Sequence, residues 1–387
     1  MQRNYVAKKV EEMAPSGIRA FFDLVLGMKD VISLGVGEPD FVTPWHIRES
    51  GIASLEAGYT SYTSNKGLMK LRLLISQMLK KRFRLTYCPN EEILITVGVS
   101  EGVDLAMRAI INPGDQVLVP MPSYVSYGPM VELAGGTAVL LRTDANCGFK
   151  ITPQEIERVC TKKTKAIMLN YPANPTGVSY SRDELEKINR VCRKHQLLVI
   201  SDEIYADLTY EGRHCAFPAL PGARDMTLYL NGFSKAYAMT GWRIGYACGP
   251  QEIIGAMTKI HQYTILCAPI IGQWAACEAL QRGDGDVETM RAEYRRRRDF
   301  VINRLAEIGL PCVKPDGAFY VFPSIEKTGM ASLDFAAKLL QEKKIALVPG
   351  SAFGKQFDGH VRMSYAAKFE QLKEAMQRLG DFIKERG

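Results

Sequence analysis

The segment NGFSKAYAMTGWRIG, residues 231–245, decides how the rest of the chain is interpreted. It follows an apolar run, residues 227–230, that predicts a short buried strand, and the chain then breaks at Gly232 into a turn of small residues that carries Lys235. A lysine amine can form a Schiff base with a carbonyl group when its surroundings favour the neutral form. Arg243 supplies a cation that can hold a phosphate group through two hydrogen bonds. The segment therefore indicates a site for a phosphorylated aldehyde.

The composition is that of an ordinary globular protein with a large core. Of the 387 residues, 47% are hydrophobic and 24% are charged, and this length predicts two domains, or one large and one small domain. The net charge of +7 is not gathered in a basic tail or interleaved with aromatic residues, so we expect no nucleic-acid partner. The densest basic run, residues 295–298, predicts a helix whose arginines mostly face water or an acidic neighbour.

The nine cysteines are scattered singly, without a Cys-x-x-Cys pair or a histidine at metal-ligand spacing. They predict reduced, mostly buried thiols, no metal site and a cytoplasmic location. Residues 1–20 mix charges throughout and lack an apolar core of signal-peptide length, and no apolar run elsewhere is long enough to cross a bilayer. The sequence thus argues against secretion and against membrane insertion.

Three features precede the first predicted strand of the main sheet. Residues 18–26 predict a short amphipathic helix. Residues 35–41, GVGEPDF, contain a Gly-x-Gly pair but lack the third glycine and the following helix of a dinucleotide fingerprint, so these glycines either admit a ligand to the backbone or turn the chain. Residues 59–67 predict a polar loop ahead of a helix over residues 68–83.

Short apolar segments alternate with helical segments through the middle of the chain. The predicted strands are residues 93–97, 116–119, 138–141, 165–169, 197–200, 227–230 and 244–248, and the predicted helices include 103–111 and 182–195. This α/β alternation is typical of a parallel sheet covered on both faces by helices, whose ligands bind beyond the carboxyl ends of the strands. The turn at residues 98–102, with Ser100, presents free backbone N–H groups to an anion where the next helix begins.

Polar side chains follow several of these strands. Asn174 follows one predicted strand, Asp202 and Tyr205 follow the next, and Lys235 follows a third. Each has an ordinary interpretation by itself, Asn174 as a turn residue, Asp202 as a helix cap and Tyr205 as a core ring. Because the ends of parallel strands meet at one edge of the sheet, their joint placement predicts a ligand site.

With these motifs the chain resembles the class I, fold-type I pyridoxal-phosphate aminotransferases over essentially its whole length. The motifs that carry the resemblance are GVGEPDF from Gly35, NPTG from Asn174, DEIY from Asp202, SKAYAMTGWR from Ser234 and VRMSY from Val361. GAFY from Gly317 and VPGSAFG from Val348 are most similar to the branch that contains the prokaryotic aspartate and aromatic amino-acid aminotransferases.

The resemblance implies a fold-type I pyridoxal-phosphate transferase, with a mostly parallel seven-stranded sheet flanked by helices and a smaller α+β domain. It implies an N-terminal arm at residues 1–44 that forms part of the small domain, a large cofactor domain at 45–279, and a small C-terminal domain at 280–387 that closes on bound substrate. It also implies cis peptide bonds before Pro122 and Pro175.

The resemblance assigns the catalytic roles to Lys235, Asp202 and Tyr205. Lys235 would hold pyridoxal 5'-phosphate as a Schiff base and then move the proton between the Cα atom of the substrate and the C4' atom of the cofactor. Asp202 would keep the pyridine nitrogen protonated, and Asn174 and Tyr205 would hydrogen-bond the phenolate oxygen. Arg362 would bind the α-carboxylate of the substrate, with Gly37 and Asn174 beside it.

The remaining cofactor contacts are implied in the same way. Tyr124 would stack on the ring. The residues implied to bind the phosphate group are Val99, Ser100 and Glu101 through their backbone, Ser234 and Arg243 through their side chains, and Tyr62 from the partner subunit. The last of these implies a homodimer with shared active sites.

The implied activity is a ping-pong transfer of an amino group from an L-amino acid to 2-oxoglutarate. Ser100 stands where some prokaryotic aspartate enzymes carry a lysine, which argues against strict aspartate specificity. An aromatic or broad-range donor is favoured, because residues 27–35 and 317–320 are more similar to aromatic or broad-range enzymes. No motif fixes a cation for a distal carboxylate, although Arg19, Lys66 and His261 are candidates. Aspartate and N-acetyl-diaminopimelate therefore stay open as donors.

Two other classes of protein use the same machinery. A carbon–sulfur β-lyase would release pyruvate and ammonia instead of transferring the amino group. A ligand sensor of the aminotransferase fold would need a DNA-binding domain ahead of residues 35–41, where the sequence gives only a short segment.

Overall fold

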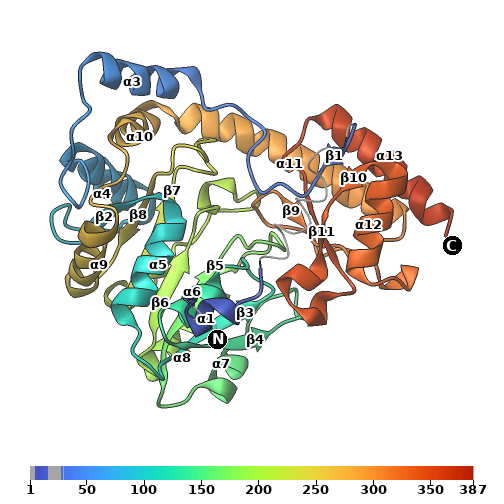
Figure 1. The fold of residues 1–387 in the computed structure, drawn as a ribbon, viewed down its shortest axis with the longest axis horizontal. Coiled ribbons are helices and arrows are strands. Elements are labelled where there is room, and N and C mark those ends of the chain that lie inside the picture. Colours follow the sequence, from blue (N-terminus) through green and yellow to red (C-terminus); the bar gives the residue numbers. More distant parts are fainter. Residues whose placement is uncertain (1–4, 16–27, 29, 387) are drawn as a thin grey trace.

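A seven-stranded sheet forms the centre of the larger part of the molecule in the computed structural model, which describes residues 5–15, 28 and 30–386 (Figure 1). Its strands are β2 (Ile93–Thr96), β3 (Gln116–Met121), β4 (Thr137–Arg142), β5 (Thr164–Asn170), β6 (Leu198–Asp202), β7 (Thr227–Gly232) and β8 (Gly245–Cys248). They lie in the order β2-β8-β7-β6-β5-β3-β4. Only β8 runs antiparallel to its neighbours, so the prediction of a mostly parallel seven-stranded sheet is confirmed.

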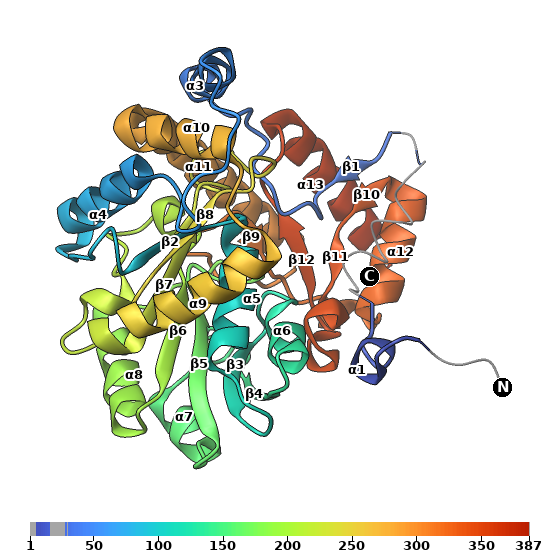
Figure 2. The same ribbon diagram turned by 60° about the vertical axis from the view of Figure 1, so that its left-hand side comes forward.

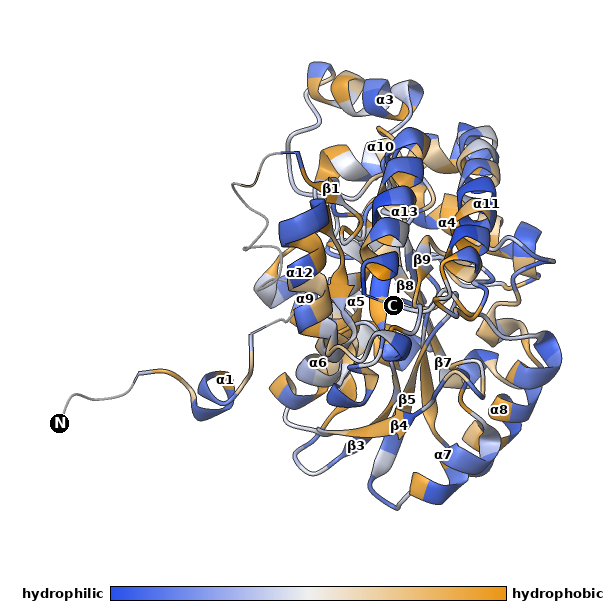
Figure 3. Ribbon diagram, turned by 90° about the vertical axis from the view of Figure 1, so that its right-hand side faces the viewer, coloured by the Kyte–Doolittle hydropathy of each residue, from blue (hydrophilic) through white to orange (hydrophobic). Residues whose placement is uncertain are grey.

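Helices cover both faces of this sheet. They are α3 (Trp45–Glu56), α4 (Met69–Phe83), α5 (Gly98–Ile110), α6 (Tyr127–Leu133), α7 (Pro153–Val159), α8 (Arg182–Lys194), α9 (Gln251–Thr264) and α10 (Ile270–Arg282). Figure 2 shows α9 and α5 crossing one face, and Figure 3 shows α7 and α8 on the opposite side. The alternation of side chains along β6 explains the arrangement, because Val199 packs in the cluster beneath α8 while Ile200 packs in the cluster beneath α5 and α9.

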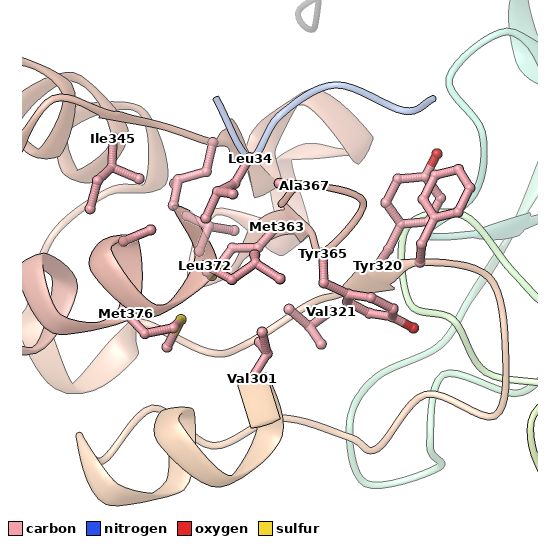
Figure 4. Close-up of a cluster of buried hydrophobic side chains, with 14 of the residues drawn as sticks. Leu34, Val301, Tyr320, Val321, Ile345, Met363, Tyr365, Ala367, Leu372 and Met376 are labelled. Carbon is pink, nitrogen blue, oxygen red and sulfur yellow. The ribbon is translucent and has the colours of Figure 1, made fainter. Parts of the chain in front are cut away.

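A smaller α+β part contains two further sheets. The short strands β1 (Ile32–Ser33) and β10 (Ile345–Ala346) pair in parallel, and β11 (Val348–Pro349), β12 (Val361–Ser364) and β9 (Tyr320–Val321) form an antiparallel sheet. The helices α11 (Asp284–Glu307), α12 (Ser332–Lys343) and α13 (Phe369–Lys384) pack on them. Leu34 from the N-terminal side lies in the same apolar cluster as Val301, Met363 and Met376 (Figure 4).

The shorter elements complete the described chain. Helix α1 (Lys8–Glu11) contacts α6, where the Lys9 amine donates a hydrogen bond of 3.2 Å to the backbone oxygen of Glu132. The short 3-10 helices are Ala206–Leu208, Phe217–Ala219, Arg224–Met226, Glu326–Thr328, Gly350–Phe353 and Lys355–Phe357. None of the helices described is long and apolar enough to cross a membrane.

Most of the predicted elements are present, with shifted ends. The predicted strands agree with the observed ones to within two residues, whereas the helix predicted over residues 103–111 begins five residues earlier, at Gly98. Cis peptide bonds precede Pro122 and Pro175 as predicted, and a third precedes Pro172. The helix predicted over residues 18–26 lies outside the described residues, and the boundaries at residues 45 and 279 stay predictions.

Two predictions about side chains need correction or refinement. All nine cysteines are free, but only Cys192, Cys248 and Cys277 are buried, so the prediction of mostly buried thiols is wrong. The arginines at residues 295–298 all have acidic partners, as expected. Arg297 and Arg298, however, are buried instead of facing water, because the second half of α11 packs against both parts of the molecule.

Replacement of Phe335 by Ala should lower the free energy of unfolding by about 3–5 kcal/mol. The ring is fully buried on α12 and packs edge-on against Phe382, with ring centroids 5.4 Å apart. Leu333 lies two residues earlier on the same helix and is 54% exposed, so Leu333→Ala is the matched control and should cost less than about 1 kcal/mol. Urea unfolding of both variants measures the difference, and equal losses would contradict this account of the core.

Candidate active site

A cavity of about 820 Å³ lies at the carboxyl ends of β5, β6 and β7, and residues of the smaller part close its other side. Of the site residues predicted from the sequence, those that line it are Gly37, Val99, Ser100, Tyr124, Asn174, Asp202, Tyr205, Ser234, Lys235, Arg243 and Arg362. Glu101 and Tyr62 do not line it. The edge of the sheet therefore gathers nearly all of the predicted side chains in one place.

Lys235 lies in the turn that follows β7. Its Nζ atom donates a hydrogen bond of 2.6 Å to the backbone oxygen of Gly37. Burial lowers the pKa of the Lys235 amine to about 8; the Glu38 carboxylate opposes this shift, while the charges of Arg362 and Arg243 add to it. A lysine with this pKa has a substantial neutral fraction near neutral pH and can act as a nucleophile or a base.

Asp202 is the last residue of β6. Its Oδ1 atom accepts a hydrogen bond of 3.1 Å from the backbone N–H of Ile204, and its Oδ2 atom accepts one of 2.7 Å from the hydroxyl group of Tyr127. Burial raises the pKa of the Asp202 carboxyl to about 6, although both hydrogen bonds and the charge of Lys235 favour the ionised form. The carboxylate is thus charged at neutral pH and can pair with a cationic ring nitrogen.

Arg362, on β12, is almost completely buried. Its Nη1 atom donates to Oδ1 of Asn174 at 2.9 Å and its Nη2 atom donates to the backbone oxygen of Gly35 at 2.6 Å, while Nε has no partner among the described residues. The guanidinium lies 4.6 Å from the centroid of the Tyr320 ring, and the Tyr320 hydroxyl is 2.9 Å from that of Tyr205. Within the described part of the chain no carboxylate pairs with Arg362, so the cavity holds a cation that can bind an anionic group of a ligand.

The first turn of α5 and Arg243 face each other at one end of the cavity. Gly98 has a φ angle of 71°, which favours glycine, and a Cβ atom on it would lie 2.4 Å from Nη2 of Arg243 and displace that side chain. Val99 and Ser100 follow it and line the cavity together with Ser234. Backbone N–H groups at the start of a helix, combined with an arginine, suit a phosphate group.

Four other candidate residues named from the sequence do not line the cavity, and the roles implied for Glu101 and Tyr62 stay predictions. The Glu101 side chain does not line the cavity. Its Oε1 atom lies 2.7 Å from Nδ1 of the fully buried His261. The Lys66 amine donates a hydrogen bond of 2.7 Å to the backbone oxygen of Asn90. Neither Lys66 nor His261 lines the cavity, so its lining does not support either as the cation for a distal carboxylate, and Arg19 lies outside the described residues. Tyr62 is 81% exposed.

Sequence reasoning missed two aromatic residues of the cavity wall. Tyr127 contacts Asp202 and packs edge-on against Tyr124, with ring centroids 5.6 Å apart. Tyr320 contacts Tyr205 and Arg362. For Tyr127 the available signal was its position three residues after Tyr124. For Tyr320 it was the GAFY motif, which was used only to identify the family.

Side-chain contacts of Asp40, away from the cavity, and of Glu38, on its wall, anchor the loop at residues 35–41. Both carboxylate oxygens of Asp40 accept hydrogen bonds from Nη1 of the buried Arg297, at 2.8 and 2.9 Å, and Oδ1 also accepts one from the Tyr294 hydroxyl. Glu38 accepts a hydrogen bond of 2.8 Å from Thr240. These contacts fix the backbone oxygens that hold Lys235 and Arg362.

The donor set of the cavity fits pyridoxal phosphate. It combines an amine for an aldehyde, a buried carboxylate for a ring nitrogen, and a helix start with an arginine for a phosphate group. Among residues 5–15, 28 and 30–386, no group of three His, Cys, Asp or Glu side chains is arranged to hold a metal ion.

Comparison with known proteins gives consistent results along the chain. The sequence model of the family described as aminotransferase class I and II matches residues 29–379. The protein YugH of Bacillus subtilis (strain 168) is 51% identical over 98% of each chain. An aspartate aminotransferase of Pyrococcus abyssi is 44% identical over 98% of this chain and 99% of its own. The crystal structure of an aromatic aminotransferase from Pyrococcus horikoshii OT3 superimposes with a TM-score of 0.91 at 44% identity, covering 95% of this chain and 99% of that chain.

Replacement of Glu38 by Gln should lower the pKa of Lys235 further, because the Glu38 carboxylate favours the charged amine. We expect the midpoint of amine reactivity to move down by about half a pH unit, since Glu38 is exposed and partly screened. Brief reaction with a small aldehyde, trapping by borohydride and mass spectrometry of Lys235 measure this midpoint across a pH series. Glu370→Gln on α13 removes a carboxylate that does not line the cavity, and the account fails if both variants shift alike.

Proposed function

The chain belongs to the aminotransferase class I and II family and is a pyridoxal-phosphate-dependent aminotransferase, and from this premise we propose that it transfers the amino group of an aromatic amino acid, or of a broad range of L-amino acids, to 2-oxoglutarate. The observation that carries the proposal is the convergence of Lys235, Asp202, Asn174, Tyr205 and Arg362 in one cavity. These side chains come from separate strands and loops, yet each has the chemistry that one part of the reaction requires.

Lys235 is the proposed catalytic base and acid. Its Nζ atom would bind the cofactor, be released by the incoming amino group, and then carry a proton away from the substrate's Cα atom. The cofactor, when bound, supplies an electron sink for the electron pair left on that carbon. A pKa of about 8 for Lys235 allows the amine to accept and return a proton near neutral pH.

The other polar residues of the cavity hold the reactants. Asp202 would keep the ring nitrogen protonated, and Asn174 and Tyr205 would donate to the phenolate oxygen. Tyr124 would stack on the ring face of the cofactor. The phosphate group would be bound by the side chains of Ser234 and Arg243 and by the backbone of Val99, Ser100 and Glu101. Arg362 would bind the α-carboxylate of the substrate beside Gly37 and Asn174.

The proposed donor class is supported by the charges around the cavity. In the described part of the chain, the basic side chains that line it are Lys235, Arg243 and Arg362, and each has a role in the scheme above. A distal carboxylate of aspartate would find no further cation there. The remaining wall includes Val36 and the ring of Tyr320, which suit an apolar or aromatic side chain. Aspartate and N-acetyl-diaminopimelate are the alternative donors, and these observations favour them less.

The donor can be identified by the visible absorption of the purified enzyme during separate additions of phenylalanine, tyrosine, aspartate, alanine and cystathionine. Without a keto acid present, the proposed donor should convert the cofactor completely to its amino form, and 2-oxoglutarate should reverse the change. Lys235→Ala should abolish the conversion because the amine that moves the proton is lost. A response to aspartate alone would replace the proposed donor class, and accumulation of pyruvate and ammonia would identify a carbon–sulfur β-lyase.

We also propose a homodimer in which Tyr62 reaches the phosphate group of the other subunit's cofactor, and a cytoplasmic location. Tyr62 does not line the cavity of its own chain and is 81% exposed. Other large exposed side chains belong to neighbouring segments. Asn65 in the Tyr62 loop donates to the backbone oxygen of Leu266, and Tyr263, near the end of α9, is 86% exposed. Such a surface suits contact with a second copy of the chain.

Mixed dimers test the sharing of active sites. A dimer of one Lys235→Ala subunit and one Tyr62→Ala subunit, isolated through two affinity tags, contains one site with both side chains intact. It should have about half of the wild-type activity, whereas the Lys235→Ala homodimer is inactive and the Tyr62→Ala homodimer binds the cofactor about tenfold more weakly. If the mixed dimer is no more active than the mean of its parents, Tyr62 does not act across the interface.

A further inference from the structure

Tyr127 is a buried residue at the start of α6, and it stands behind the carboxylate of Asp202. It is 2% exposed, its ring lines the cavity, and its hydroxyl group donates a hydrogen bond of 2.7 Å to Oδ2 of Asp202. Asn170 adds a second constraint, because its Nδ2 atom donates to the backbone oxygen of Asp202 at 2.9 Å. With the Ile204 N–H on Oδ1, the carboxylate is held in one orientation and can still accept another donor from the cavity.

We propose that Tyr127 is a positioning residue that acts on the cofactor through Asp202, by keeping this carboxylate charged and correctly oriented for the ring nitrogen. The inference rests on the proposed function of Asp202. It adds a role for a hydroxyl group that the reaction scheme does not otherwise use.

The groups around Asp202 act on its charge in opposite directions. Burial favours the neutral carboxylic acid, and the neighbouring Glu203 also opposes ionisation. The charge of Lys235 and the hydrogen bond from Tyr127 favour the ionised form, and Tyr205 is the other titratable group that faces the carboxylate. A hydrogen bond to a charged acceptor is stronger than one between neutral groups, so loss of the Tyr127 hydroxyl should shift the balance towards the acid.

Glu203 provides an internal comparison. It follows Asp202 directly, is fully buried and does not line the cavity. Its Oε1 atom accepts hydrogen bonds from the hydroxyl groups of Tyr171, at 3.1 Å, and Ser201, at 2.7 Å. Tyr171→Phe therefore removes the same kind of tyrosine–carboxylate bond, one residue away, from a carboxylate that cannot reach the cofactor.

The test measures the dissociation constant of pyridoxamine 5'-phosphate, which binds without a covalent bond to Lys235, from pH 5 to 9. Wild type, Tyr127→Phe and Tyr171→Phe are compared by isothermal titration calorimetry of the cofactor-free enzymes. The loss of affinity on acidification should occur about one pH unit higher in Tyr127→Phe than in wild type. Its affinity should be about fivefold to tenfold weaker near pH 5.5 and nearly equal to wild type near pH 8.5, while Tyr171→Phe follows wild type.

Each outcome distinguishes the two proposals. If wild type binds pyridoxamine phosphate and Tyr127→Phe follows the same profile, the role of Tyr127 is overturned and the proposed function stands. If wild type does not bind the compound, the proposed function itself fails. Should Tyr127→Phe fold poorly, 3-fluorotyrosine at position 127 keeps the ring and is a stronger donor, so the acid limb should then move to lower pH. No shift, or a shift to higher pH, would contradict the inference.

Discussion

Burial of opposite charges in one cavity is the constraint on which the rest of the site depends. The same loss of water lowers the pKa of Lys235 to about 8 and raises that of Asp202 to about 6, because in each case the charged form is the one disfavoured. Both groups thereby approach neutral pH, where a proton can be gained or lost at little cost. On the surface the amine would stay protonated, so the chemistry requires the enclosing walls as much as the side chains.

Those walls are held together by the loop at residues 35–41. Its backbone oxygens accept hydrogen bonds from Lys235 at Gly37 and from Arg362 at Gly35, and so connect the turn after β7 with the sheet of the smaller part. The loop is itself fixed by the ion pair of Asp40 with the buried Arg297 on α11. Nη1 of Arg297 contacts both carboxylate oxygens of Asp40, and such a charged contact fixes an orientation in a way that apolar packing does not.

Features that depend on neighbouring residues could be predicted from the sequence. Features that depend on contacts between distant parts of the chain could not. Apolar runs located the strands, and the residues after them located Lys235, Asp202 and Asn174, because parallel strands end at one edge. Tyr127 could not be found in this way, since its partner lies 75 residues further along the chain and its hydroxyl has no periodic signal. The position of His261 outside the cavity could not be predicted either, because it follows from the packing of α9 against α5, which brings His261 to Glu101.

Arg362 shows what the site demands of its substrate. Its two terminal nitrogens bind neutral oxygens, Nε has no partner in the described part of the chain, and burial lowers the pKa of the guanidinium. A buried cation without a counter-charge is unfavourable, and the free energy is recovered only when an anion enters. Under the proposed function that anion is the α-carboxylate, which every amino donor and every 2-oxo acid acceptor carries. The two half-reactions can therefore share one cavity, because the α-carboxylate, which all substrates carry, pairs with Arg362. The parts of the wall that contact the substrate side chain can differ between enzymes without affecting this pairing.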